Sequence, residues 1–205
     1  MKLKTLICSF LSLSLLAGCA SAPAASDQDT SGQTPEPTAE SDTDSIVVYF
    51  SATGNTRKAA EDISELTGAR LYELIPDQPY TAEDLDFNED SSRVMQEYEN
   101  PDERDTPLSN AKVSDWDQYD IVYLGYPIWW ADAAWPVDHF AEDNNFTGKT
   151  VYPFCTSLSS PAGSSGTNLA SMAGTGDWQP AERFAEDVSR EDVQSWLVSI
   201  GQLSD

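Results

Sequence analysis

The feature that most constrains the fold is a series of short apolar runs that alternate with helix-like stretches. Residues 46–50 are wholly apolar, and residues 121–124 and the stretch KTVYPFCTS from Lys149 are similar in character. Such runs are typical of strands that are buried on both faces. Strands separated by helical stretches form parallel sheets through right-handed crossovers. The sequence therefore predicts an α/β fold, a doubly wound parallel sheet with helices on both faces.

The remaining elements follow from spacing and from helix caps. Residues 55–67 predict a helix, because apolar residues recur at helical intervals and Gly68 follows. Residues 69–75 predict a second strand, and a fifth is expected between Trp178 and Ala185, although Pro180 weakens the pattern. Further helices are expected at 92–99 and 136–142, and behind a Ser189 cap where Val193, Trp196, Leu197 and Ile200 form a stripe.

The N-terminus has the pattern of an export signal. Lys2 and Lys4 precede an apolar run at 6–16 that is too short to span a bilayer comfortably, and small residues lead to Cys19. This resembles a bacterial lipobox. It predicts a lipoprotein signal peptide at 1–18, lipidation of Cys19 and an exported protein anchored to the membrane on the extracytoplasmic side. An uncleaved anchor or an ordinary secretion signal is the alternative.

A polar tether and a folded domain are expected to follow. Residues 20–44 are rich in Ser, Thr, Pro, Ala and acids, so 19–44 is predicted to be a lipidated cysteine plus a disordered tether, and 45–205 the domain. The chain has 35 acids against 11 bases, and loss of 1–18 would take the net charge from −24 to −26. Nucleic acid is therefore not expected as a partner. The charge favours a basic redox partner, or it serves only solubility or a salty medium.

Few residues could bind metal or form disulfides. Cys8 would leave with the signal and Cys19 would carry lipid, so Cys155 would be alone in the domain. With one histidine, no histidine-cysteine metal site is expected. His139 is interpreted as a surface helix residue and Cys155 as a small buried one. The acidic segment 84–105 is interpreted as a solvated face, with partner docking as an alternative.

Three loops should gather at the carboxyl edge of the sheet, where such folds bind ligands. The first, SATGNT, offers hydroxyls and a glycine before a helix N-terminus, which suits a phosphate but equally describes a capped turn. The second, GYPIWWADAAWP, carries Trp129 and Trp130, and at least one ring should face a ligand; Trp135 is expected in the core or at a partner surface. The third, residues 155–166, is dense in small polar residues whose amides could bind a heteroaromatic edge.

The three loops together resemble the flavodoxin-like family. SATGNT is similar to the flavodoxin phosphate-loop pattern Ser/Thr-x-Thr-Gly-x-Thr, and YDIVYLGYPIWW and FTGKTVYPFCTS are similar to the family at its next two loops. The resemblance covers about 45–201 and implies a five-stranded sheet of order 2-1-3-4-5 that binds flavin mononucleotide (FMN). It implies a phosphate site at Ser51, Thr53, Gly54, Asn55 and Thr56, an isoalloxazine wall at Pro127, Ile128, Trp129 and Trp130, and contacts to the polar ring edge from Thr156, Ser157 and Leu158.

Three hypotheses of function stay open. The first is an electron carrier whose acidic, aromatic surroundings lower the potential at which a bound flavin takes its second electron. The second is an FMN-dependent reductase that takes hydride from NADH or NADPH and passes it to a quinone or another small acceptor. The third is a surface binding module that keeps the fold without flavin.

Overall fold

A computed structural model describes residues 44–204 of the chain. The expected signal peptide, Cys19 and all but the last residue of the expected tether lie outside these residues. Within 44–204, no helix is both long enough and apolar enough to cross a membrane.

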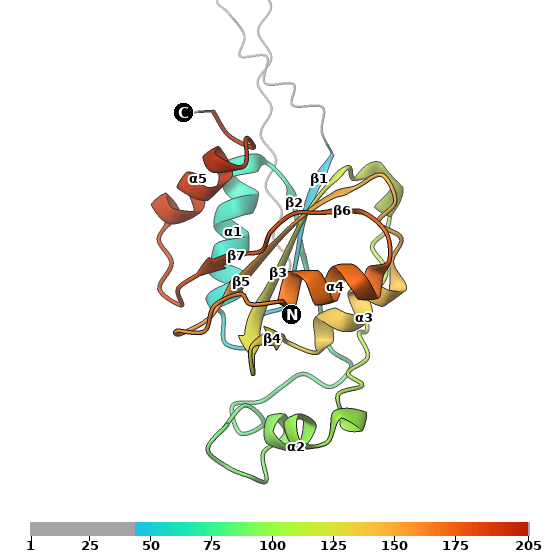
Figure 1. The fold of residues 1–205 in the computed structure, drawn as a ribbon, viewed down its shortest axis with the longest axis vertical. Coiled ribbons are helices and arrows are strands. Elements are labelled where there is room, and N and C mark those ends of the chain that lie inside the picture. Colours follow the sequence, from blue (N-terminus) through green and yellow to red (C-terminus); the bar gives the residue numbers. More distant parts are fainter. Residues whose placement is uncertain (1–43, 205) are drawn as a thin grey trace, which may run out of the picture. The chain divides into compact units, whose positions relative to one another are not determined.

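The described residues form a sheet of parallel strands with one short antiparallel addition (Figure 1). Its order is β2-β1-β3-β5-β6, β7 also pairs with β5, and β4 pairs antiparallel with β3. The strands are β1 (Ser45–Tyr49), β2 (Arg70–Glu73), β3 (Ile121–Trp129), β4 (Asp132–Ala133), β5 (Thr150–Thr156), β6 (Asp177–Trp178) and β7 (Glu182–Phe184). When the antiparallel β4 is left out, β5 is the fourth strand in chain order, and β6 and β7 share the fifth position. The predicted order 2-1-3-4-5 is therefore confirmed.

The fifth position of the sheet is divided between two short strands. β6 pairs with Thr150 and Val151, and β7 pairs with the segment from Phe154 to Thr156. Pro180 lies in the gap between them, where its missing amide could not have continued the ladder. The proline that weakened the sequence prediction therefore marks a real break.

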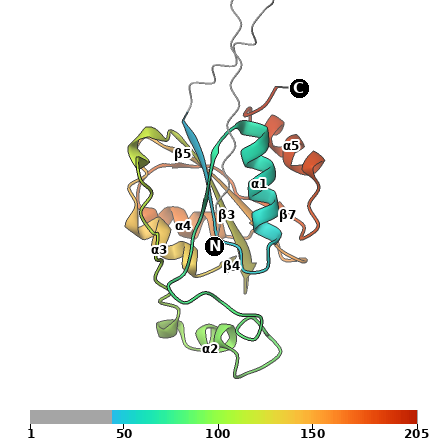
Figure 2. The same cartoon turned by 180° about the vertical axis from the view of Figure 1, so that it is seen from behind.

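Helices cover both faces of the sheet (Figure 1 and Figure 2). α1 (Asn55–Thr67) and α5 (Arg190–Ser199) lie on one face, and α3 (Pro136–Asp143) and α4 (Ser165–Ala173) lie on the other. Alternate strand residues serve the two layers: Val47 packs towards α1 and α5, whereas Val48 belongs to the opposite cluster. Burial on both faces explains why the strand sequences show no polar alternation.

The connection from β2 to β3 carries α2 (Arg93–Glu99) beyond the carboxyl edge of the sheet, close to β4 (Figure 1). Ser92 caps this helix by accepting a hydrogen bond from the Met95 amide. The segment is not solvated throughout, because Glu97 is buried and pairs with Arg93 at 2.6 Å and with the Tyr80 hydroxyl at 2.7 Å. The solvated-face interpretation is therefore wrong at Glu97.

Two elements differ from the sequence prediction. β3 does not end with the apolar run at Leu124 but continues to Trp129, so Pro127, Ile128 and Trp129 belong to a strand and not to a loop. Gly125 lies within the strand and makes no turn. The position requires glycine because a Cβ there would overlap the Phe154 ring. α4 was not predicted, since its sequence SGTNLASMA has a single large buried side chain, Leu169.

Candidate functional site

The loop between β1 and α1 is built around the hydroxyl of Ser51. Its Oγ accepts hydrogen bonds from the amides of Gly54 at 3.1 Å and Arg57 at 3.2 Å. Gly54 has φ of 98°, a left-handed conformation that favours glycine. With both acceptor positions of Ser51 occupied, its O–H remains as a donor for a further partner.

The start of α1 presents further donors. The amides of Thr53, Asn55 and Thr56 make no hydrogen bond to another residue within 44–204, as expected where a helix begins. The space in front of Gly54 is open, since a Cβ there would meet no atom within 4 Å. Unpaired amides, a hydroxyl donor and the positive end of the helix dipole could together hold an anion without a lysine.

Thr56 and Thr156 tie this loop to the end of β5. Their Oγ1 atoms lie 2.8 Å apart, and both side chains are buried. Either hydroxyl can be the donor in this bond, so one hydroxyl proton of the pair remains for another acceptor. The two predicted site residues are thus brought together, as expected for loops at one edge of the sheet, although their direct hydrogen bond was not predicted.

The tryptophan-rich segment forms a hairpin. β3 and β4 are joined by Trp130 and Ala131, which have φ of 46° and 67°. Both values lie in the left-handed region, where side chains other than glycine are strained. Such strain persists only where surrounding contacts hold it, and it is frequent at functional sites.

Trp129 lies inside an aromatic cluster at this edge. Its ring meets Phe50, Tyr80 and Trp135 edge-on, with centroids 5.1–5.8 Å apart. Phe50 and Tyr80 in turn line a cavity of about 190 Å³ beside the first loop, and the ion pair of Arg57 with Glu73 forms its polar end. The second and first segments are therefore in contact through aromatic rings.

Trp130 is held by rings from two other elements. It stacks on Tyr98 of α2 with centroids 4.4 Å apart, and on Trp135 with centroids 5.7 Å apart. Arg104 lies 5.1 Å from the Trp135 ring centroid and bonds the carbonyls of Glu97 and Tyr98. Trp135 is buried, which confirms its expected core role. Tyr98 was not among the predicted site residues, because nothing in its acidic surroundings indicated this contact.

The third segment is held from behind by Arg183 of β7. Its guanidinium donates to the Ser157 hydroxyl at 3.0 Å and to the carbonyls of Ser157 and Leu158 at 2.7 and 3.1 Å. These bonds occupy the carbonyl side of the loop. The Leu158 side chain is 80% exposed. Arg183 was missed by sequence reasoning, since only the pairing of β7 with β5 brings it to this loop.

Negative charge gathers on the α3 side of the hairpin. Asp132 accepts hydrogen bonds from Asn168 of α4 at 3.0 and 3.1 Å. Burial raises the pKa of Asp138 to about 7, and the charges of Asp132 and Glu142 act in the same direction. His139 pairs with Asp105 at 2.8 Å from a half-buried position on α3.

Cys155 has the buried role expected for it. The side chain is inaccessible to solvent, and burial raises the pKa of its thiol to about 12. A thiol with such a pKa holds its proton at neutral pH and packs as a small apolar group.

The fold defines a class, the doubly wound α/β proteins, and helix-start amides lie beyond the end of its first strand. The family model described as Flavodoxin matches residues 44–200. This chain therefore belongs to the flavodoxin family.

Solved structures agree with this assignment. A candidate flavoprotein from Bacteroides eggerthii DSM 20697 is 36% identical, with a TM-score of 0.69 over 78% of this chain and 98% of that chain. Its counterpart from Bacteroides uniformis ATCC 8492 is 34% identical, with a TM-score of 0.69 over 76% and 98%. A flavoprotein from Lactobacillus acidophilus NCFM, solved in complex with FMN, shares the fold at 20% identity, with a TM-score of 0.55 over 75% and 98%. No curated protein matches the chain.

Proposed function

We propose that this protein binds FMN at the carboxyl edge of its sheet and serves as an electron carrier. The observation that carries the proposal is the hydrogen bond between Thr56 and Thr156, which joins the anion site of the first loop to the third segment. Membership of the flavodoxin family supports it, as does the FMN complex of the Lactobacillus acidophilus protein with the same fold.

The chain's own residues fit such a ligand. The Ser51 hydroxyl and the amides of Thr53, Asn55 and Thr56 would hold the phosphate, with Gly54 leaving room for its approach. Trp129 would cover the ring together with Pro127, Ile128 and Trp130, and Thr156, Ser157 and Leu158 would meet its polar edge. When bound, FMN supplies one- and two-electron transfer, and the protein sets its orientation and potential.

The charges of the site bear on that potential. Asp132 lies in the hairpin beside the predicted ring wall, and the chain as a whole is strongly acidic. Carboxylates and apolar rings both disfavour added negative charge. The second electron should therefore be accepted at a lower potential than the first. A spectroelectrochemical titration that shows a single two-electron step near the potential of free FMN contradicts this.

Binding can be measured by adding FMN to apoprotein and following tryptophan fluorescence. Quenching that saturates at one FMN per chain is expected, because Trp129 and Trp130 lie at the proposed ring site. Riboflavin, which lacks the phosphate, is the matched control and should bind at least tenfold more weakly. Unchanged fluorescence in excess FMN contradicts the proposal and leaves the flavin-free binding module.

A carrier and a reductase differ in their turnover. Steady-state oxidation of NADH or NADPH with quinone acceptors should be negligible for a carrier that lacks its partner reductase. Rapid turnover at stoichiometric FMN would instead make the protein an FMN-dependent reductase. The acidic surface favours the first outcome, since it repels the phosphates of a dinucleotide and attracts a basic partner protein.

We also propose that the protein works at the extracytoplasmic membrane surface, held by a lipid on Cys19. The support is the signal-like sequence that ends in small residues before this cysteine. Detergent phase partitioning of the wild-type protein and of Cys19→Ser tests it. The wild-type protein should enter the detergent phase and the variant should not, whereas equal partitioning would contradict lipidation.

A further inference from the structure

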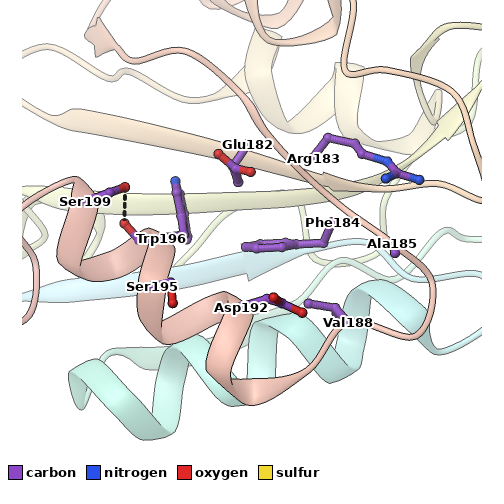
Figure 3. A pocket seen from close by; sticks show the side chains of 9 residues that line it. All are labelled: Glu182, Arg183, Phe184, Ala185, Val188, Asp192, Ser195, Trp196 and Ser199. Atoms are coloured by element: carbon purple, nitrogen blue, oxygen red, sulfur yellow. Dashed lines mark hydrogen bonds between the residues drawn. The ribbon is translucent and has the colours of Figure 1, made fainter.

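A second cavity, of about 470 Å³, lies between β7 and α5 (Figure 3). This volume is in the range of small-molecule pockets. Its lining residues are Glu182, Arg183, Phe184, Ala185, Val188, Asp192, Ser195, Trp196 and Ser199. Arg183 is the one lining residue that touches the proposed flavin site, through its bonds to Ser157 and Leu158.

The inner wall of the cavity is apolar and aromatic. Phe184, Val188 and Trp196 are all buried. The rings of Phe184 and Trp196 meet edge-on with centroids 5.6 Å apart, and both pack on Phe154 in the core. Their positions are therefore fixed by the fold, and the small part of each ring that solvent reaches forms the apolar floor of the cavity.

The outer wall consists mainly of hydrogen-bond acceptors. The hydroxyls of Ser195 and Ser199 donate to the carbonyls of Glu191 and Trp196, so their oxygens can only accept from a ligand. Asp192 accepts two bonds from Ser189 through Oδ2, which lower its pKa and leave Oδ1 for another partner. The indole nitrogen of Trp196 adds one donor near Glu182 (Figure 3).

Two carboxylates, of Glu182 and Asp192, and one guanidinium, of Arg183, line the cavity. Figure 3 shows the guanidinium of Arg183 turned away from Glu182 and Trp196, and its donors bond Ser157 and Leu158. Glu182 forms no ion pair with any other residue in 44–204. A ligand that supplies hydrogen-bond donors and positive charge would therefore complement the wall around Glu182.

We propose that this cavity binds a small organic cation, an aryl-alkylammonium compound whose ammonium group pairs with Glu182 and whose ring lies against Phe184 and Trp196. The site is separate from the proposed flavin site and does not depend on FMN binding.

The experiment compares three probes that share one ring but differ in charge: tryptamine, uncharged tryptophol and anionic indole-3-acetate. Binding to the full chain is followed by isothermal titration calorimetry at 0.15 M salt, with and without FMN. We expect tryptamine to bind at least tenfold more tightly than tryptophol, and indole-3-acetate not to bind. Amide NMR shifts on adding tryptamine should centre on residues 182–199.

Two variants distinguish specific binding in the cavity from the general attraction of a cation to an acidic protein. Glu182→Gln should weaken tryptamine binding at least tenfold and leave tryptophol unchanged. Glu186→Gln is the matched control, because it removes an exposed charge that does not line the cavity. Equal loss in both variants, equal binding of all three probes, or amide shifts elsewhere would overturn the proposal. Failure of FMN binding alone would not, since the apoprotein is tested as well.

Discussion

The Oγ1 atoms of Thr56 and Thr156 form a hydrogen bond of 2.8 Å between residues that are 100 positions apart in the chain. Thr56 lies in the first turn of α1 and Thr156 is the last residue of β5. The bond fixes the spacing between two segments that flank the proposed flavin site. Because one proton of the pair remains free to donate, the contact can persist when an anion binds.

Replacing Thr56 by valine tests this role. The variant keeps the volume but loses the hydroxyl, so FMN affinity should fall by about 1.5–3 kcal/mol, the value of a hydrogen bond to a charged group. Thr56→Ser should retain most of the affinity. Thr67→Val is the control, since the Thr67 hydroxyl bonds Ile63 at the far end of α1. Fluorescence titration with FMN measures all three, and wild-type affinity in Thr56→Val would remove Thr56 from the phosphate site.

The hairpin turn predicts that a substitution by glycine increases the stability of the protein. Ala131 has φ of 67°, which costs an alanine about 1–2 kcal/mol, whereas glycine adds only about 0.5–1 kcal/mol of chain entropy. Ala131→Gly should therefore raise the free energy of unfolding by roughly 0.5–1 kcal/mol. Ala170→Gly, inside α4, should lower it by about 1 kcal/mol. Urea unfolding compares the two, and a loss of stability in Ala131→Gly would show that the turn is not strained.

Asp138 predicts a pH dependence of stability. Its pKa is raised from 3.8 to about 7 in the folded protein, so the folded state binds more protons than the unfolded state between these values. The stability that Asp138 contributes is present below pH 4 and is lost as pH rises to 7. Asp138→Asn should therefore be more stable than the wild type at pH 8, by a few kcal/mol at most.

The difference in the free energy of unfolding between Asp138→Asn and the wild type, followed across pH, separates the effect of Asp138 from that of the many other carboxyls. It should grow between pH 4 and 7 and then level off. Asp143→Asn, which removes an exposed carboxylate on the same helix, should show no such trend. A constant difference between Asp138→Asn and the wild type would contradict the raised pKa. Thermal unfolding at a series of pH values gives the comparison.

Arg183→Gln should loosen the third segment. The glutamine cannot reach the Ser157 hydroxyl and the carbonyls of Ser157 and Leu158 together. Hydrogen exchange of amides 157–160 should therefore accelerate. The affinity for FMN should fall by about tenfold. Arg190→Gln breaks exposed ion pairs and should change neither. If exchange accelerates while FMN affinity stays constant, the segment does not contact the flavin.

The sheet could be predicted because burial on both faces leaves a direct trace in the sequence. Val47 and Val48 point to opposite layers and both are buried, so the apolar run of the first strand follows from the fold. α5 could likewise be predicted, because Ser189 and Asp192 form a capping box before an apolar stripe. α4 left no such trace, because small residues let it pack closely without a wide apolar face.

The site was predictable in its segments and not in its contacts. Tyr98 reaches Trp130 only because the connection from β2 folds back across the carboxyl edge of the sheet. The apolar run predicts a strand only to Leu124, whereas Gly125 continues the strand and leaves room for the Phe154 ring. In both cases the deciding partner lies far away in the sequence, where local patterns carry no information.

The fifth sheet position is divided between β6 and β7, and this division affects whether two copies of the protein can pair along that edge. An edge strand exposes unpaired amides and carbonyls, and long flat edges promote aggregation. Here that edge consists of a two-residue strand that begins with Asp177 and a three-residue strand that begins with Glu182, separated by residues 179–181 with Pro180 in the middle. Within residues 44–204 this edge offers no continuous ladder to a second sheet, so the break disfavours edge-to-edge pairing of two copies on this side.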